Sequence, residues 1–261
     1  MENLMRKKLL EGRQVIGTFF ESGSASLVEG LALAGMDYLI VDTEHGPFDV
    51  ESTMDFVRAA LLRGITPLAR IKDCTRPSVL KMLDIGVQGL IIPCVNTVEE
   101  VEKLVEYGKY YPLGRRGFAF GRDAGWGYAG DAADIPSYFG NRNRETMIIP
   151  QCETKGCLDH IEEVAAIRGV DGIFIGPYDL SVALGRPAVF DTAEFKDAAA
   201  RILAACKNAG KPCLIYADGA AAARARLAQG FDSAAVSMDT IIYIEAFRNL
   251  LKEIRENPLT V

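Results

Sequence analysis

Short apolar runs alternate with longer amphipathic segments along almost the whole chain. The runs are continuously apolar, as in parallel strands that are buried on both faces, and the segments after them repeat apolar residues at helical spacing. A strand, a helix and a second strand in succession form the βαβ unit of a parallel sheet. We predict strands at Val15–Phe20, Tyr38–Val41, Thr66–Ala69, Gly89–Ile92, Met147–Ile149, Gly172–Ile175, Cys213–Tyr216 and Ala234–Val236.

The predicted helices have recognisable ends. Ser24, Thr97 and Thr192 are suited to N-caps, and Gly64 and Gly210 are suited to the turn after a helix. We predict helices at Ser24–Ala34, Val50–Arg63, Arg76–Ile85, Thr97–Tyr107, Gly219–Gln229 and Thr240–Arg255, and one helix through Ile167 between the fifth and sixth strands. Eight such units predict the α/β fold class, as a closed (β/α)8 TIM barrel that forms a single domain over residues 1–261.

Composition narrows the class of partner. With 261 residues, 49% of them hydrophobic, the chain can bury a large core. Its net charge of −6 argues against nucleic acid or an anionic membrane as a partner, since both need a concentrated basic surface. No segment has the length of a signal-peptide core or a membrane span, so we expect a cytoplasmic protein. The six cysteines are scattered without a C-x-x-C pair, which favours reduced core residues over zinc ligands or disulfides.

Polar residues collect at the carboxyl ends of the predicted strands, where the active site of a barrel lies. Glu153 follows the fifth strand and Asp179 follows the sixth, so the two carboxylates should emerge side by side at one rim. Two hard oxygen ligands with open coordination positions suit Mg²⁺ or Mn²⁺. Either residue alone could instead cap a helix or a turn, and it is the pair that favours a metal.

Three more candidates stand at the ends of the second and third strands. His45 is one of two histidines, and its pKa range suits proton transfer at neutral pH. Asp42 lies three residues before it and could orient its ring. Arg70 ends an apolar strand, where it could bind a substrate carboxylate or an enolate oxygen. The simpler interpretations are a surface histidine and a structural ion pair of Arg70 with Asp42 or Glu44.

The motifs at these strand ends resemble the signatures of the class II metal- and pyruvate-dependent aldolases. This family includes the 4-hydroxy-2-oxoheptanedioate (2,4-dihydroxyhept-2-ene-1,7-dioate) and 2-keto-3-deoxyglucarate aldolases. The resemblance extends from Gly17 to about Phe247. The motifs are Asp42-Thr43-Glu44-His45-Gly46-Pro47, Arg70, Pro150-Gln151-Cys152-Glu153-Thr154 and Gly176-Pro177-Tyr178-Asp179-Leu180-Ser181.

The resemblance implies an enzyme, a carbon–carbon lyase that reversibly cleaves a 4-hydroxy-2-oxo acid to pyruvate and an aldehyde. The reaction would pass through a metal-stabilised pyruvate enolate. The resemblance places a divalent metal, Mg²⁺, Mn²⁺ or Co²⁺, on Glu153 and Asp179, with pyruvate chelated to it.

The same resemblance assigns roles to the other site residues. It implies that Arg70 lies near the keto oxygen of pyruvate and that His45 acts with Asp42 in proton transfer. The substrate-binding positions that it implies are Arg70, Gln151 and the backbone amides around Tyr178 and Asp179, which would bind the carboxylate.

Two stretches depart from the family pattern. Tyr178 stands before the metal aspartate, where the family often has a small residue, so its ring could narrow the pocket. The segment Gly114–Gly130 differs from the usual family loop and leaves two interpretations open. It is either a mobile surface loop, or a lid or subunit-contact loop in which Arg122 binds an acidic or hydroxylated aldehyde.

Other functions of a barrel would require different residues at the strand ends. A Schiff-base lyase would need a lysine at a strand end, whereas Lys72 and Lys155 lie in loops. A phosphosugar isomerase would need open helix N-termini where Asp218 and Asp239 stand. A CoA-thioester lyase of related barrel fold and a non-catalytic ligand-binding barrel remain as alternatives. By resemblance we expect a homohexamer, with the amphipathic helix Thr240–Arg255 in subunit contacts.

Overall fold

Eight parallel strands form a closed barrel in the computed structural model, which describes residues 2–256. Each strand pairs with the next along the chain, and the eighth pairs with the first. The strands are β1 (Val15–Phe20), β2 (Tyr38–Asp42), β3 (Thr66–Arg70), β4 (Gly89–Ile92), β5 (Met147–Cys152), β6 (Ile173–Ile175), β7 (Cys213–Ala217) and β8 (Ser233–Met238). The predicted (β/α)8 TIM barrel is confirmed; residues 1 and 257–261 of the expected domain lie outside the described residues.

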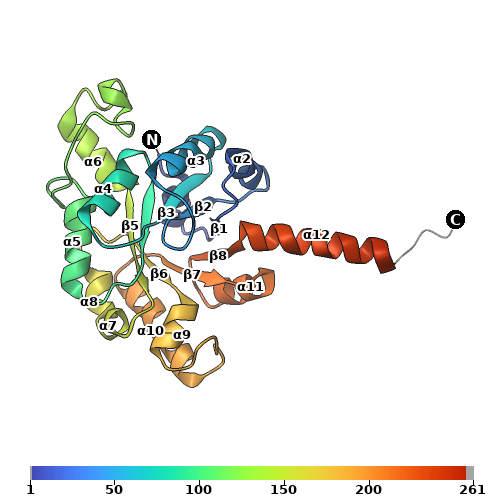
Figure 1. The fold of residues 1–261 in the computed structure, drawn as a ribbon. Helices are drawn as coiled ribbons and strands as arrows, with labels where there is room; N and C mark the ends of the chain where they lie inside the picture. The colour runs from blue at the N-terminus through green and yellow to red at the C-terminus, as the bar shows by residue number, and fades with distance from the viewer. Residues whose placement is uncertain (1, 257–261) are drawn as a thin grey trace.

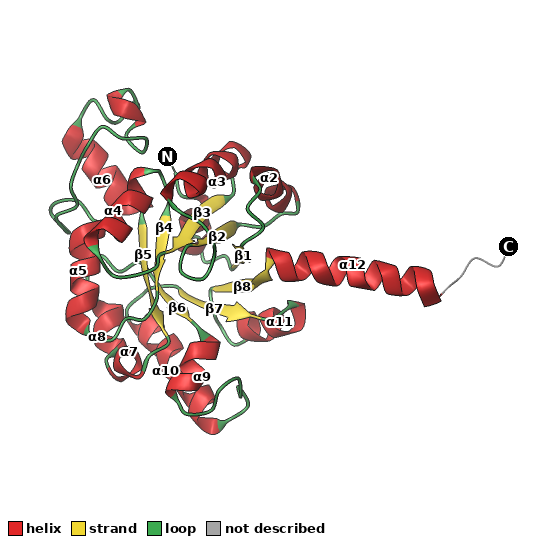
Figure 2. Cartoon of the chain, in the orientation of Figure 1, coloured by secondary structure: helices red, strands yellow, loops and turns green. Residues whose placement is uncertain are grey.

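Helices surround the barrel, as Figures 1 and 2 show. They are α1 (Leu4–Leu10), α2 (Ala25–Leu33), α3 (Val50–Arg63), α4 (Arg76–Asp84), α5 (Val98–Gly108), α6 (Ile135–Glu145), α7 (Lys155–Asp159), α8 (Ile161–Ala166), α9 (Pro177–Ala183), α10 (Ala193–Asn208), α11 (Ala220–Ala228) and α12 (Asp239–Glu256), with a 3-10 turn at Gly125–Gly127. Asp49 and Thr97 begin α3 and α5 with capping boxes. None of the helices described between residues 2 and 256 is long and apolar enough to cross a membrane.

The crossover between β5 and β6 differs from the prediction of one helix. It consists of α7 and α8, with His160 between them. Thr154 caps α7 by accepting a hydrogen bond from the backbone of Cys157, and His160 leaves the helical conformation at φ −111°. The single-helix prediction was wrong because buried residues continue at helical spacing from Leu158 to Ile161, so the pattern does not reveal the break.

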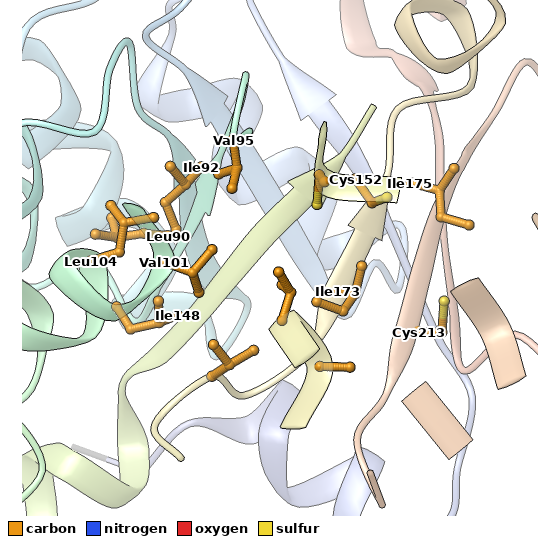
Figure 3. Packing of buried hydrophobic residues seen from close by; sticks show 14 of the residues in the cluster. Leu90, Ile92, Val95, Val101, Leu104, Ile148, Cys152, Ile173, Ile175 and Cys213 are labelled. Carbon is orange, nitrogen blue, oxygen red and sulfur yellow. The ribbon is translucent and has the colours of Figure 1, made fainter. Parts of the chain in front are cut away.

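Two apolar layers stabilise the barrel. The inner layer fills its interior with strand side chains such as Phe19 and Phe174. A larger outer layer packs the strands against the surrounding helices, and Figure 3 shows Leu90, Ile92 and Ile148 within it. Because both faces of the strands are buried, the continuous apolar runs in the sequence have a direct structural cause.

Helix α12 projects away from the barrel as an isolated rod (Figures 1 and 2). None of its residues is buried, and its apolar side chains from Ile241 to Ile254 are between 39% and 59% exposed. In a complete barrel the last helix belongs to the outer ring that covers the strands. Helix α12 therefore presents an amphipathic surface that its own barrel does not cover.

Candidate active site

A cavity of about 210 Å³ opens at the carboxyl ends of the strands. Its lining includes the polar residues Arg70, Gln151 and Asp179 and the aromatic residues Phe19 and Tyr178. These residues come from β1, β3, β5 and the first turn of α9, and the closed topology brings them to one rim.

A second cavity of about 390 Å³ lies at the other end of the barrel. Arg6, Lys207 and Lys211 are among its lining residues, and it contains none of the candidate residues from the strand ends. The smaller cavity is therefore the candidate active site.

Arg70 is held by two carboxylates. The register of β2 and β3 places it opposite Asp42, and its Nε and Nη2 donate to Asp42 Oδ1 and Oδ2 at 2.9 and 2.5 Å. Its Nε is also 3.2 Å from Oε2 of Glu44. The guanidinium lies 4.8 Å from the centroid of the Phe19 ring, in a cation–π contact. The structural ion pair that the sequence left open is present, and it points Arg70 into the cavity with both Asp42 and Glu44 behind it.

Glu153 is buried where β4, β5 and β6 meet. Its Oε1 accepts a hydrogen bond from the backbone N–H of Cys94 at 2.8 Å, and its Oε2 accepts one from Nε2 of Gln151. A Cβ at Gly176 would lie 2.5 Å from Oε2 of Glu153, so only glycine allows the carboxylate this close to the end of β6. That end leads directly into α9, which carries Asp179 in its first turn.

Negative charge accumulates around this carboxylate. Burial raises the pKa of Glu153 to about 7, and although hydrogen bonds from Cys94 and Gln151 oppose that shift, the nearby carboxylates of Asp179 and Glu44 add to it. Burial likewise raises the pKa of Glu44. A region of desolvated carboxylates is suited to a cation, which would favour their charged forms.

The residues present fit a divalent metal. Gln151 Oε1 is buried without a hydrogen-bond partner in the described part of the chain, so a polar ligand can still be accommodated beside Glu153. No group of three or more His, Cys, Asp or Glu side chains among residues 2–256 is arranged to hold a metal ion. The protein would thus contribute the oxygens of Glu153 and Asp179 and leave the other coordination positions to substrate and solvent.

His45 lies at the cavity, but its ring is not held by Asp42. The side chain is 70% exposed, and its Nε2 is 3.9 Å from Oε2 of Glu44. Asp42 accepts a 3.4 Å hydrogen bond from the backbone N–H of His45, while its carboxylate binds Arg70. The expected orientation of the imidazole by Asp42 is therefore absent from this structure, because the strand register pairs Asp42 with Arg70.

The Gly114–Gly130 segment lies at the opposite end of the barrel from the cavity. Arg122 donates from Nη1 to the carbonyl oxygen of Ile85 at 2.6 Å, where α4 leads into the amino end of β4. Arg116 is buried there beside Asp84, with 2.9 Å between Nη2 and Oδ1. The interpretation in which Arg122 binds aldehyde was wrong for the cavity of its own barrel, because contacts with α4 hold the arginine at the other end.

Two residues at the site were missed by the sequence analysis. Cys94 has φ 56° and directs its backbone N–H at Glu153, and it is exposed, whereas Cys152, Cys157, Cys206 and Cys213 are buried as expected for core residues. Glu21 follows β1, and its pKa is raised by burial and by the nearby carboxylates of Asp42 and Asp239. A polar residue directly after an apolar strand was the signal for Glu21; no local pattern marked Cys94.

Comparison with known proteins identifies the family. The family model described as HpcH/HpaI aldolase/citrate lyase matches residues 15–246. The chain belongs to this family. It is 33% identical over 257 residues to the 2-keto-3-deoxy-L-rhamnonate aldolase of Salmonella gallinarum, covering 96% of the chain and 92% of that protein. The enzyme of the same name from Escherichia coli is 32% identical over 248 residues, covering 94% of the chain and 91% of that protein.

A solved structure gives the same answer. An HpcH/HpaI aldolase/citrate lyase family protein from Burkholderia cenocepacia is 32% identical, with a TM-score of 0.90 and coverage of 97% of this chain and 99% of that one. The expected enzyme class is confirmed: this HpcH/HpaI member is a carbon–carbon lyase of the class II aldolase type. The aldolase names of the relatives favour this class over a CoA-thioester lyase or a non-catalytic barrel.

Proposed function

We propose that this aldolase reversibly cleaves a 4-hydroxy-2-oxo acid to pyruvate and an aldehyde with the help of a divalent metal. The observation that carries the proposal is the buried carboxylate of Glu153, which lies near Asp179 and next to Gln151 and Gly176 of the cavity that Asp179 and Arg70 also line. A carboxylate whose pKa is raised to about 7 by burial is costly to keep charged unless a cation is bound next to it. The relatives named for 2-keto-3-deoxy-L-rhamnonate support a sugar-derived 2-oxo acid as the substrate class.

Glu153 and Asp179 are the proposed metal ligands, for Mg²⁺, Mn²⁺ or Co²⁺. When bound, such a cation acts as a Lewis acid that draws electron density from the keto group of a 2-oxo acid. Gln151 holds Glu153 in place through its amide N–H and would face the bound pyruvate. The backbone N–H groups at the start of α9, around Tyr178 and Asp179, receive no side-chain cap from the described part of the chain and are suited to the substrate carboxylate.

Arg70 is the proposed second source of positive charge at the keto oxygen. Its contacts within the described chain use Nε and Nη2, so Nη1 remains for the substrate. Because Asp42 holds the guanidinium in place before substrate arrives, no reorganisation is needed as negative charge develops on the oxygen. Asp42 would accordingly act as a positioning residue for Arg70.

His45 is the proposed base for the C4 hydroxyl of the substrate. Its exposed ring lies at the cavity and can rotate toward a bound hydroxyl group. Removal of that proton lets the C3–C4 bond break, so that an aldehyde leaves and the bonding electrons remain on the pyruvate fragment. In the direction of synthesis the imidazolium returns the proton to the new alkoxide.

The protein is also proposed to be a homo-oligomer, a hexamer by family resemblance, in which α12 packs on another copy. The uncovered amphipathic face of α12 supports subunit contact. The expected cytoplasmic location stays a prediction.

The test of the proposed reaction measures pyruvate release from a 4-hydroxy-2-oxo acid without any thioester present. EDTA should abolish release, and Mg²⁺, Mn²⁺ or Co²⁺ should restore it. Glu153→Ala and Asp179→Ala should each lose stoichiometric metal, measured by elemental analysis, while circular dichroism shows a folded barrel. Full activity of the metal-free protein, or a requirement for a CoA thioester, would refute the proposal, and binding without turnover would indicate a ligand-binding barrel.

A further inference from the structure

Tyr178 is fixed at the edge of the active-site cavity by three residues from two other segments of the chain. Its hydroxyl donates a 2.8 Å hydrogen bond to Oδ1 of Asp218, just after β7. Its ring packs edge-on against Phe190, between α9 and α10, with 5.1 Å between ring centroids, and against Tyr216 of β7 at 6.1 Å. A ring held in this way forms a fixed wall, although it is 44% exposed.

The wall continues into a row of aromatic rings. Tyr216 contacts Phe19 with 6.0 Å between ring centroids, and Phe19 contacts Phe174 at 6.0 Å. All four rings line the cavity, and Phe19 also contacts the guanidinium of Arg70 at 4.8 Å. The row thus runs from Phe19, beside Arg70, through Tyr216 to Tyr178, which is next to the solvent-exposed Asp218. Because Arg70 would bind the 2-oxo acid end of a substrate, the ring of Tyr178 is placed to meet the part derived from the aldehyde.

The space in front of this wall is small. The whole cavity of about 210 Å³ would have to hold both pyruvate and the aldehyde. Ligand pockets for larger molecules are typically about 300–1,000 Å³. The ring of Tyr178, held by Asp218, therefore limits the length of aldehyde chain that the cavity can enclose.

The charges around the cavity disfavour an acidic aldehyde. Among the described residues that line it, Arg70 is the only lysine or arginine, and it is already paired with Asp42 and Glu44. The carboxylate of Asp218 is bound to the hydroxyl of Tyr178 at the edge of the cavity. A carboxylate on the aldehyde would therefore find no unpaired lysine or arginine among these lining residues.

We propose that Tyr178, held by Asp218, is a specificity-determining residue that restricts the aldehyde substrate to short, uncharged molecules. The proposal rests on the proposed aldolase function and adds the chemical class of the second substrate. Tyr178 sets the length limit through its ring, and Asp218 is a positioning residue that acts through the hydroxyl of Tyr178.

The test compares aldol addition of pyruvate to propanal and hexanal by the metal-loaded protein. The readout is the ratio of the two kcat/KM values within each variant, so any effect on pyruvate activation cancels. The wild type should favour propanal by at least about tenfold, and Tyr178→Ala should bring the ratio close to one. Tyr178→Phe and Asp218→Ala keep a ring but remove the hydrogen bond, and each should relax the ratio by about threefold.

Two control variants test whether a change in the ratio comes from the position of the Tyr178 ring or from an unspecific effect of substitution. Asp218→Asn keeps an acceptor oxygen for the Tyr178 hydroxyl and should retain the wild-type ratio. Tyr128→Ala removes an exposed tyrosine from the Gly114–Gly130 segment at the other end of the barrel and should also leave the ratio unchanged. A comparison of butanal with succinic semialdehyde, its carboxylated counterpart, tests charge, and butanal should be preferred by at least about tenfold.

Exchange of pyruvate methyl protons with solvent deuterium distinguishes failure of this inference from failure of the proposed function. If the metal-loaded wild type shows no exchange, the pyruvate aldolase function itself fails. If exchange proceeds but the wild type uses hexanal as well as propanal, or prefers succinic semialdehyde, the inference is overturned. A folded Tyr178→Ala protein with the wild-type ratio would overturn it as well.

Discussion

At the scale of single residues, the raised pKa of Glu153 should make metal binding depend on pH. Burial raises its folded-state pKa from 4.5 to about 7, so below pH 7 a metal ion must displace a proton from it. We expect the dissociation constant for Mn²⁺, measured by titration calorimetry, to rise about tenfold for each unit of pH below 7. A dissociation constant that is flat between pH 8 and pH 5 would contradict the assignment of Glu153.

The same raised pKa should make the metal-free protein more stable at low pH, whereas metal binding becomes weaker there. The pKa of Glu153 is higher in the folded state than in the unfolded state, so protonation of this side chain favours folding. That contribution to stability is fully present below pH 4.5 and is lost as pH rises through about 7. The Tm of metal-free protein should therefore rise between pH 8 and pH 6 relative to a Glu153→Gln control, whose side chain does not titrate. An equal pH dependence of Tm in both proteins would show that Glu153 is not the group responsible.

Substitutions of Arg70 and His45 should impair different reactions. Arg70→Ala removes both the positive charge beside Asp42 and the planar guanidinium, so exchange of pyruvate methyl protons should fall by about 10²–10³. Arg70→Lys keeps the charge but loses the planar guanidinium. His45→Ala should lower C–C cleavage by roughly 10²–10⁴ and affect exchange less. The measurements are deuterium exchange by NMR and pyruvate release, with metal content as a control. Wild-type cleavage by His45→Ala would make the histidine a structural residue.

At the scale of single elements, the contact between β1 and β2 depends on Gly17, which has no side chain. A Cβ at Gly17 would lie 2.4 Å from Cδ2 of Tyr38, a fully buried ring whose hydroxyl is 2.8 Å from Oγ of Ser233. Overpacking of this kind costs about 1–3 kcal/mol, so Gly17→Ala should lower the Tm by several degrees in thermal unfolding.

A matched glycine in a helix should behave in the opposite way. Gly30 in α2 is exposed, and a Cβ there would meet nothing within 4 Å. Gly30→Ala should keep or raise the Tm, because alanine favours the helix by about 0.5–1 kcal/mol. Equal Tm changes in the two variants would show that the space around Tyr38 is not limiting.

At the scale of the whole molecule, α12 exposes apolar surface that its own barrel does not cover. Its apolar side chains, including Ile244 at 53% and Phe247 at 49%, are exposed along a helix that points away from its barrel (Figure 1). If these residues pack on another copy, Ile244→Glu combined with Phe247→Glu should convert the oligomer into smaller species in light scattering. Arg248→Ala, on the same helix, is the control and should keep the wild-type mass. A monomeric wild type at micromolar concentration would exclude the subunit contact.

The sequence by itself determined the barrel and the location of the site. Continuous apolar strands followed by amphipathic helices allow few other arrangements, since parallel connections place every strand's carboxyl end on the same side. That rule is enough to bring Glu153, Asp179 and Arg70 to one rim, as the structure shows for the cavity that Arg70 and Asp179 line and for Glu153 beside Gly176. These features follow from local pattern and chain direction, which a sequence displays.

Only the tertiary structure decided which side chain pairs with which. The nearness of Asp42 and His45 in sequence suggested a contact between their side chains, but the register of β2 and β3 gives the Asp42 carboxylate to Arg70. Arg122 is fixed at the other end of the barrel by a carbonyl of α4, and α12 leaves the ring although its pattern is that of a packed helix. These outcomes depend on strand register and on contacts between residues distant in sequence, and local hydrophobic pattern contains no information about either.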